Sequence, residues 1–123
     1  MKTEPVVRSK LVKPDRQAIR AALHELQAEL QKLYGSQAPL ILVYGSYARG
    51  EENAVSDVDI LLLYPYTIQP GQEIRRISSV LANLNLRHQV LISVLPAREK
   101  EYQQASGIFW KNLHKEGVPI EQI

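Results

Sequence analysis

Apolar residues recur at helical spacing in the first third of this chain. Between residues 15 and 35 they fall at steps of three and four, which predicts one amphipathic helix. Asp15 is suited to the N-cap of this helix, and Gly35 is suited to its C-terminal end. The apolar stripe that would face the core consists of Ile19, Ala22, Leu23, Leu26, Leu30 and Leu33.

Three apolar runs further along the chain predict β-strands. They cover residues 40–44, 57–64 and 89–95, and a proline directly follows the second and the third run. The first run stops at Gly45, after which a short helix is expected to begin near Ser46. Since helical segments separate the strands, the pattern predicts a small α/β domain.

Helical spacing returns between the second and third strands and again after the third. Residues 72–86 form one predicted helix, and residues 99–105 and 108–116 form two more, separated at Ser106-Gly107. We expect Trp110 and Leu113 on the last helix to pack on the body of the domain. The apolar face of the helix at 72–86 comprises Ile74, Ile77, Leu81 and Leu84.

Two carboxylates, Asp57 and Asp59, stand at the start of the second strand. Alternate side chains of a strand point to the same face, so these two carboxylates project together. They repel each other and resist burial, and a bound divalent cation would offset that repulsion. Hard oxygen ligands of this kind suit Mg²⁺ together with a substrate phosphate. Taken alone, the pair is also compatible with an ordinary solvated strand edge.

The turn at Gly45-Ser46 complements this pair. Gly45 has no β-carbon, so a phosphate group can approach its backbone closely. A helix beginning near Ser46 would present free N–H groups and a positive dipole end to an anion. A Gly-Ser pair after a strand is also common in turns without any such role.

The combination of the two motifs resembles a known family. Gly45-Ser46, followed after ten residues by Asp57-Val58-Asp59 and flanked by apolar strands, is similar to the signature of the DNA polymerase β-like nucleotidyltransferase superfamily. Within it, residues 45–50 and 56–59 are most similar to minimal nucleotidyltransferases. The resemblance implies the nucleotidyltransferase palm, a small mixed and twisted β-sheet with helices packed mainly on one side.

The resemblance also implies a reaction and roles for individual residues. In this family a nucleoside monophosphate, here expected to be AMP from ATP, is transferred with loss of pyrophosphate. Asp57 and Asp59 match the catalytic residues that bind Mg²⁺, and Gly45 and Ser46 match the turn that holds the terminal phosphates. Arg49 would neutralise phosphate charge, although its position equally suits a surface arginine.

The third predicted strand departs from the family pattern. The family carries a third carboxylate on this strand, and residues 89–95 contain none. Alternation turns toward the site either Gln89, Leu91 and Ser93 or else Val90, Ile92 and Val94. Glu99 and Glu101 lie beyond Pro96 and are poor substitutes. A catalytically degenerate module that binds nucleotide or a partner is therefore the alternative to an enzyme.

Length and composition limit the hypotheses about domain organisation and function. At 123 residues the chain is expected to be one domain over residues 1–123, with residues 1–13 as a possible loose arm. The net charge of +2 makes direct binding to nucleic acid an unfavoured hypothesis. The absence of cysteine excludes disulfides and thiol catalysis. With neither a signal-peptide core nor a membrane-length apolar run, we expect a cytoplasmic protein.

The short length also bears on the acceptor. Larger family members select their acceptor with additional domains, and 123 residues leave no room for one. A third hypothesis, transfer to a small molecule or a nucleic acid, is therefore the weakest. Minimal nucleotidyltransferases are typically paired with a small all-helical HEPN-domain toxin. The resemblance implies such a partner, with this chain as an antitoxin that transfers AMP to it.

Overall fold

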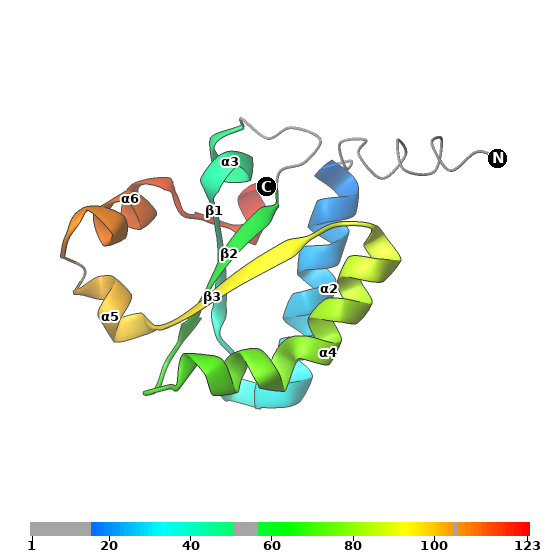
Figure 1. The fold of residues 1–123 in the computed structure, drawn as a ribbon, viewed down its shortest axis with the longest axis horizontal. Coiled ribbons are helices and arrows are strands. Elements are labelled where there is room, and N and C mark those ends of the chain that lie inside the picture. Colours follow the sequence, from blue (N-terminus) through cyan, green and yellow to red (C-terminus); the bar gives the residue numbers. More distant parts are fainter. Residues whose placement is uncertain (1–15, 51–56, 105) are drawn as a thin grey trace.

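The computed structural model describes residues 16–50, 57–104 and 106–123 (Figure 1). The expected order of helices and strands is confirmed, while the expected N-cap Asp15 and the arm at 1–13 lie outside these ranges. None of the helices in these ranges is long and apolar enough to cross a membrane. The elements are α2 (Arg16–Tyr34), η1 (Gly35–Gln37), β1 (Leu40–Tyr44), α3 (Gly45–Arg49), β2 (Val58–Tyr64), α4 (Pro70–His88), β3 (Ile92–Arg98), α5 (Glu99–Gln103), α6 (Ile108–Glu116), β4 (Val118–Pro119) and η2 (Ile120–Gln122).

The strands form a mixed four-stranded sheet in the order β3-β2-β1-β4. β1 is antiparallel to both β2 and β4, whereas β2 and β3 are parallel. β4 was not predicted, because Gly117 and Pro119 are residue types that favour turns. It has only two residues, which lie opposite Leu42 and Val43 of β1.

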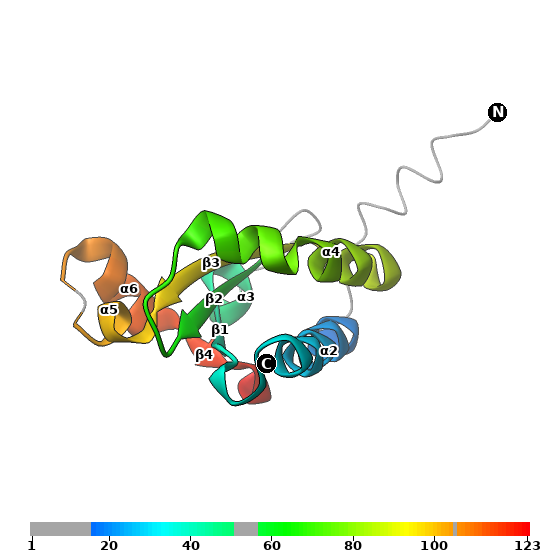
Figure 2. The ribbon, with the colours of Figure 1, turned by 90° about the horizontal axis from the view of Figure 1, so that it is seen from below.

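The two long helices cover one face of the sheet. α2 and α4 lie side by side on this face in both views, and α5 and α6 lie on the other (Figures 1 and 2). The predicted stripe of α2 is buried except for Leu33, whose exposed fraction is 46%. At this end of the helix its neighbour Tyr34 packs against the core instead. The main cluster includes Ile19, Leu23, Leu26, Leu30, Ile41, Val43, Ile60, Leu62, Ile77 and Leu84.

A smaller cluster lies on the opposite face, beneath α5 and α6. Its buried members are Leu61, Leu63, Ala97 and Leu113, and the ring of Trp110 packs against them. The predicted packing of Trp110 and Leu113 on the body is thus confirmed. The apolar face of α4 is also confirmed, although two of its predicted members, Ile74 and Leu81, are only half-buried.

The predicted end of the third strand at Pro96 was wrong. β3 covers Ile92–Arg98 and passes through Pro96 at the edge of the sheet. The carbonyl of Leu91 accepts a hydrogen bond from the N–H of Val58 at 2.8 Å, so Leu91 directs its backbone polar groups toward β2. Alternation then places the nitrogen of Pro96 on the open side of β3, where no neighbouring strand requires an N–H donor.

The predicted start of this strand was wrong as well. α4 continues to His88, and Gln89 ends it in a left-handed conformation with φ of 54°. The N–H of Val90 then bonds to the carbonyl of Asn85 at 3.1 Å, as in other left-handed helix ends. These residues close the helix and begin the turn, so β3 starts later than its apolar run suggests.

Candidate active site at the start of β2

Asp57 and Asp59 lie at the start of β2, where the sequence predicted them. Asp57 directly precedes the strand, and Asp59 is its second residue. Asp59 is paired with Tyr44 on β1 and with Ser93 on β3. Paired residues direct their side chains to the same face, so these three form a row across the sheet. Tyr44 packs with the smaller cluster, which places the row on the face of α5 and α6.

The carboxylate of Asp59 lies against the backbone of Gly45. Gly45 has a φ of 75°, and a β-carbon added to it would stand 2.6 Å from Asp59 Oδ2. Both the backbone conformation and the close approach therefore require glycine at this position. The structure thus brings together the Gly-Ser turn and the second carboxylate of the Asp-x-Asp motif.

Contacts with the core and with α2 hold the helix that follows this turn. α3 includes Ser46 in its first turn, and the ring of Tyr47 is buried in the main core cluster. Arg16 Nη2 donates a hydrogen bond to the carbonyl of Tyr47 at 2.9 Å, which ties α3 to α2. The start of α3 is therefore held in place beside Asp59 by groups outside the site.

The two carboxylates of the site influence each other electrostatically. Partial burial raises the pKa of Asp59, and the charge of Asp57 raises it further, while Arg49 acts in the opposite direction. Burial and the charge of Asp59 also raise the pKa of the Tyr44 hydroxyl. A bound cation would offset the repulsion between the two carboxylates, and Tyr44 keeps its proton beside Asp59. The motifs gave no indication of Tyr44.

Arg49 is held by a residue that the sequence analysis did not identify. Its Nη1 lies 3.0 Å from Oε1 of Glu116, the last residue of α6. The two residues are 67 positions apart, and no motif connects them. The packing of α3 against α6 brings this further acid to the edge of the site.

The third carboxylate expected from the family is absent opposite Asp59, where β3 carries Ser93. Ser93 is on the site face of β3 and is the neighbour of Asp59, and Leu91, two residues earlier and just before the strand, is exposed like Ser93. Glu99 and Glu101 begin α5, beyond the other end of β3, and neither substitutes for this acid. Within the part of the chain that the structure describes, no three acidic, histidine or cysteine side chains are grouped to hold a metal ion.

Tyr64 and Tyr66 lie too far from the two carboxylates to contribute to the candidate site. They flank the end of β2 that is remote from Asp59. Tyr64 is fully buried, with its ring centroid 5.6 Å from that of Tyr34 and 5.8 Å from that of Tyr66. Packing at the end of the strand therefore accounts for these tyrosines.

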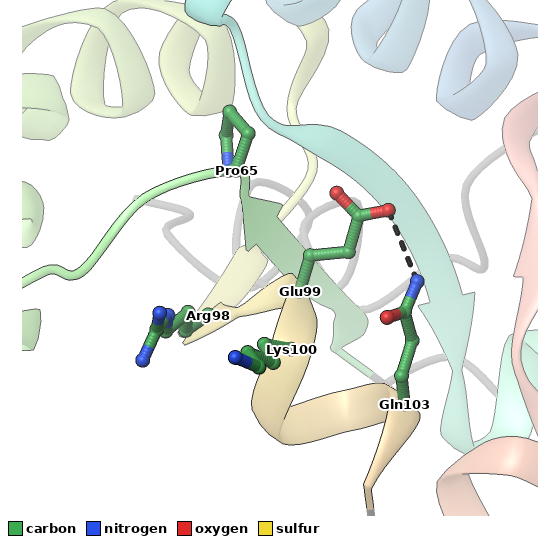
Figure 3. Close-up of a pocket in the computed structure, with 5 residues that line it drawn as sticks. All are labelled: Pro65, Arg98, Glu99, Lys100 and Gln103. Atoms are coloured by element: carbon green, nitrogen blue, oxygen red, sulfur yellow. Dashed lines mark hydrogen bonds between the residues drawn. The ribbon is translucent and has the colours of Figure 1, made fainter.

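An open pocket also lies at this remote end of the sheet (Figure 3). It has a volume of about 340 Å³ and is bounded by the ends of β2 and β3 and by α5. Within it, Gln103 Nε2 donates a hydrogen bond to Glu99 Oε1 at 3.4 Å. Its position separates it from the two carboxylates. Its lining residues are Pro65, Arg98, Glu99, Lys100 and Gln103.

The geometry of the carboxylates and the Gly-Ser turn agrees with comparisons to known proteins. Residues 23–106 match the nucleotidyltransferase domain family. The chain belongs to this family. The match includes both site motifs and all of β1, β2 and β3, and it confirms the resemblance inferred from the sequence.

Two similar proteins extend this assignment. Over 73 residues the chain is 30% identical to the "putative protein adenylyltransferase MJ0141" of Methanocaldococcus jannaschii. This alignment covers 58% of this chain and 71% of the relative. A chain in the crystal structure of a toxin–antitoxin with AMP-PNP superposes with a TM-score of 0.54 and 19% identity. The superposition covers 82% of this chain and 71% of the other. It confirms the predicted nucleotidyltransferase fold.

Proposed function

We propose that this protein transfers AMP from ATP to a hydroxyl group on a partner protein. In this reaction the hydroxyl oxygen bonds to the α-phosphorus, and the bond from that phosphorus to the bridging oxygen breaks. Pyrophosphate leaves, and the hydroxyl proton passes to a base or to solvent. One observation carries the proposal: the Asp59 carboxylate lies against Gly45, beside the start of α3. The similarity to a relative named as a protein adenylyltransferase supports a protein acceptor.

Within the site, one group of residues would bind the metal and another would bind the phosphate groups. Asp57 and Asp59 would hold Mg²⁺, because two like-charged carboxylates on one face suit a hard cation. When bound, Mg²⁺ supplies charge stabilisation for the transferring phosphoryl group. Gly45 and Ser46 would bind the terminal phosphates through the backbone at the start of α3. Arg49 would add positive charge on the same side.

We also propose that the acceptor is a toxin and that this protein is its antitoxin. A chain of the same fold occurs in a toxin–antitoxin crystallised with AMP-PNP, which supports both the partner class and the nucleotide. The sequence resemblance adds that the partner would be a small all-helical HEPN-domain protein. Such a partner would bring the accepting side chain to the open side of the site, where Leu91 and Ser93 are exposed.

One observation favours a second candidate function. β3 (Ile92–Arg98) contains no acidic residue and carries Ser93 opposite Asp59, whereas the sequence resemblance implies a third carboxylate on this strand that activates the acceptor hydroxyl. A site with two carboxylates would still bind metal and nucleotide, while transfer itself would be slow. The protein would then neutralise its partner by contact, as a nucleotide-binding module without chemistry.

An intact mass spectrum of the protein with its co-purified partner tests both candidates. After incubation with Mg-ATP, the first candidate predicts a mass gain of one AMP group on the partner. Asp57→Asn and Asp59→Asn keep the size of each side chain and remove its charge, so both should abolish the gain. Their folding is checked by thermal unfolding. Full neutralisation of the partner by these variants, without any mass gain, would favour contact inhibition and contradict the transferase.

A further inference from the structure

The backbone around Glu116 is fixed on both sides. Leu113, one turn earlier on α6, is buried in the smaller cluster, and its carbonyl accepts the N–H of Gly117 at 2.8 Å. Directly afterwards, Val118 lies opposite Val43 in the ladder between β4 and β1. Glu116 is thus presented to the site by a rigid junction between a helix and the sheet.

Arg49 is on α3, which packs against both α6 and β2, and two acidic groups of these elements interact with its charge. One is Glu116, whose Oε1 is 3.0 Å from Arg49 Nη1. The other is Asp59, which is within the electrostatic reach of Arg49. A guanidinium group that turned fully toward Asp59 would neutralise the carboxylate on which the proposed metal site depends. Arginine and a metal cation would then compete for one ligand.

We propose that Glu116 is a positioning residue that holds Arg49 on the α6 side of the site. In this position the guanidinium group stays beside the expected phosphate groups and leaves Asp57 and Asp59 available to a cation. The inference rests on the proposed function, because it assumes that these carboxylates bind a metal. It adds a role for an acid that belongs to neither motif.

The proposal predicts a specific pattern of cation affinities. Glu116→Gln keeps the shape of the side chain and removes its charge, so Arg49 should turn toward Asp59. Because the ion pair is partly exposed, we expect the affinity for the cation to fall by about two- to fivefold. Arg49→Gln should bind the cation at least as tightly as the wild type. The double variant Arg49→Gln/Glu116→Gln should recover that affinity, since the competing guanidinium is gone.

Binding of Mn²⁺ alone, measured by electron paramagnetic resonance on the full chain, tests this pattern. Mn²⁺ serves as the probe because it accepts the same carboxylate ligands as Mg²⁺. Wild-type affinity in Glu116→Gln would overturn the inference, as would an equally weak double variant. A purely structural role of Glu116 predicts the latter, because removing Arg49 cannot repair a displaced helix.

The controls separate this inference from the proposed function. If the wild type and Asp59→Asn bind Mn²⁺ equally poorly, the metal site itself fails, and with it the proposed function. If the wild type binds Mn²⁺, Asp59→Asn does not, and Glu116→Gln matches the wild type, only the role of Glu116 fails. Thermal unfolding of each variant, followed by the fluorescence of the single tryptophan, Trp110, establishes that it is folded.

Discussion

Gly45 and Asp59 are in contact across the turn that joins β1 to α3, with room between them for a hydrogen atom and not for a methyl group. A β-carbon at Gly45 would stand 2.6 Å from Asp59 Oδ2. This contact joins the two sequence motifs into one site. It also makes the effect of a single substitution predictable.

Gly45→Ala should displace the Asp59 carboxylate and weaken cation binding. The positive φ of Gly45 adds a strain of about 1–2 kcal/mol for any residue with a β-carbon. Gly50→Ala is the matched control, because Gly50 has a φ of 74° and no atom within 4 Å of an added β-carbon. Urea unfolding should show a loss of stability in both variants, at least as large in Gly45→Ala because of the clash, while Mn²⁺ titration should show weakened binding in Gly45→Ala alone. Equal Mn²⁺ affinities would contradict the structural argument.

Ser93→Asp should restore a third carboxylate beside Asp59. The side chain at this position is exposed on the site face, so the substitution should cost little stability. We expect AMP transfer to rise by about tenfold, below the factor of about 100 that a well-placed general base contributes. Ser93→Asn is the control for size and polarity. An unchanged rate in Ser93→Asp, measured by the mass gain over time, would show that this position does not replace the family's third acid.

Asp59→Asn should stabilise the metal-free protein at neutral pH. Burial and the charge of Asp57 raise the pKa of Asp59 in the folded state. Protonation of Asp59 therefore stabilises the fold below the unfolded-state pKa, and this contribution is lost as the pH rises through the folded-state pKa. The thermal midpoint of Asp59→Asn should exceed that of the wild type at pH 7 with a chelator present.

Two further measurements decide that prediction. The difference in midpoint should shrink on acidification, because the wild-type carboxyl then becomes neutral as well. Addition of Mg²⁺ should raise the midpoint of the wild type and leave Asp59→Asn unchanged. A wild type that is more stable than the variant at pH 7 without metal would show that Asp59 supports the fold.

Tyr34→Phe should destabilise the protein without affecting the site. Glu73 is buried, and Tyr34 donates a hydrogen bond to its Oε1 at 2.6 Å; Arg76 Nη1 is 3.9 Å from the same oxygen. Loss of the hydroxyl leaves a buried carboxylate short of a donor, which costs about 1–3 kcal/mol. Tyr66→Phe, at a half-buried position nearby, should cost less. Urea unfolding measures the loss, and an accompanying loss of Mn²⁺ affinity would contradict the separation of this cluster from the site.

The parts of the site that could be predicted are those governed by local geometry. Alternation along a strand is sufficient to place Asp57 and Asp59 on one face. The position of Gly45 at the end of an apolar run is sufficient to identify the turn before α3. Neighbouring residues determine both features, so the order of residue types along the chain carries the information.

The remaining features depend on contacts between distant segments. Arg49 meets Glu116 only because α6 packs beside α3, and Tyr34 meets Glu73 only because α2 packs beside α4. Pro96 indicated the end of a strand, since proline is unsuitable in a central strand. β3 is an edge strand, however, and this is known only from the order of the whole sheet. No pattern within one segment contains this information.

The edge position of Pro96 has a consequence for how this protein meets other chains. Along the outer side of β3, the N–H of Ile92 is bonded to Asn85 Oδ1 at 3.1 Å, and the N–H of Arg98 is bonded to Glu101 Oε1 at 3.3 Å. Pro96, between them, has no N–H to offer. An additional strand would therefore find few donors with which to pair, and sheet-to-sheet aggregation of copies is discouraged. We therefore expect a partner that docks at this edge to be recognised through side chains and not through strand pairing.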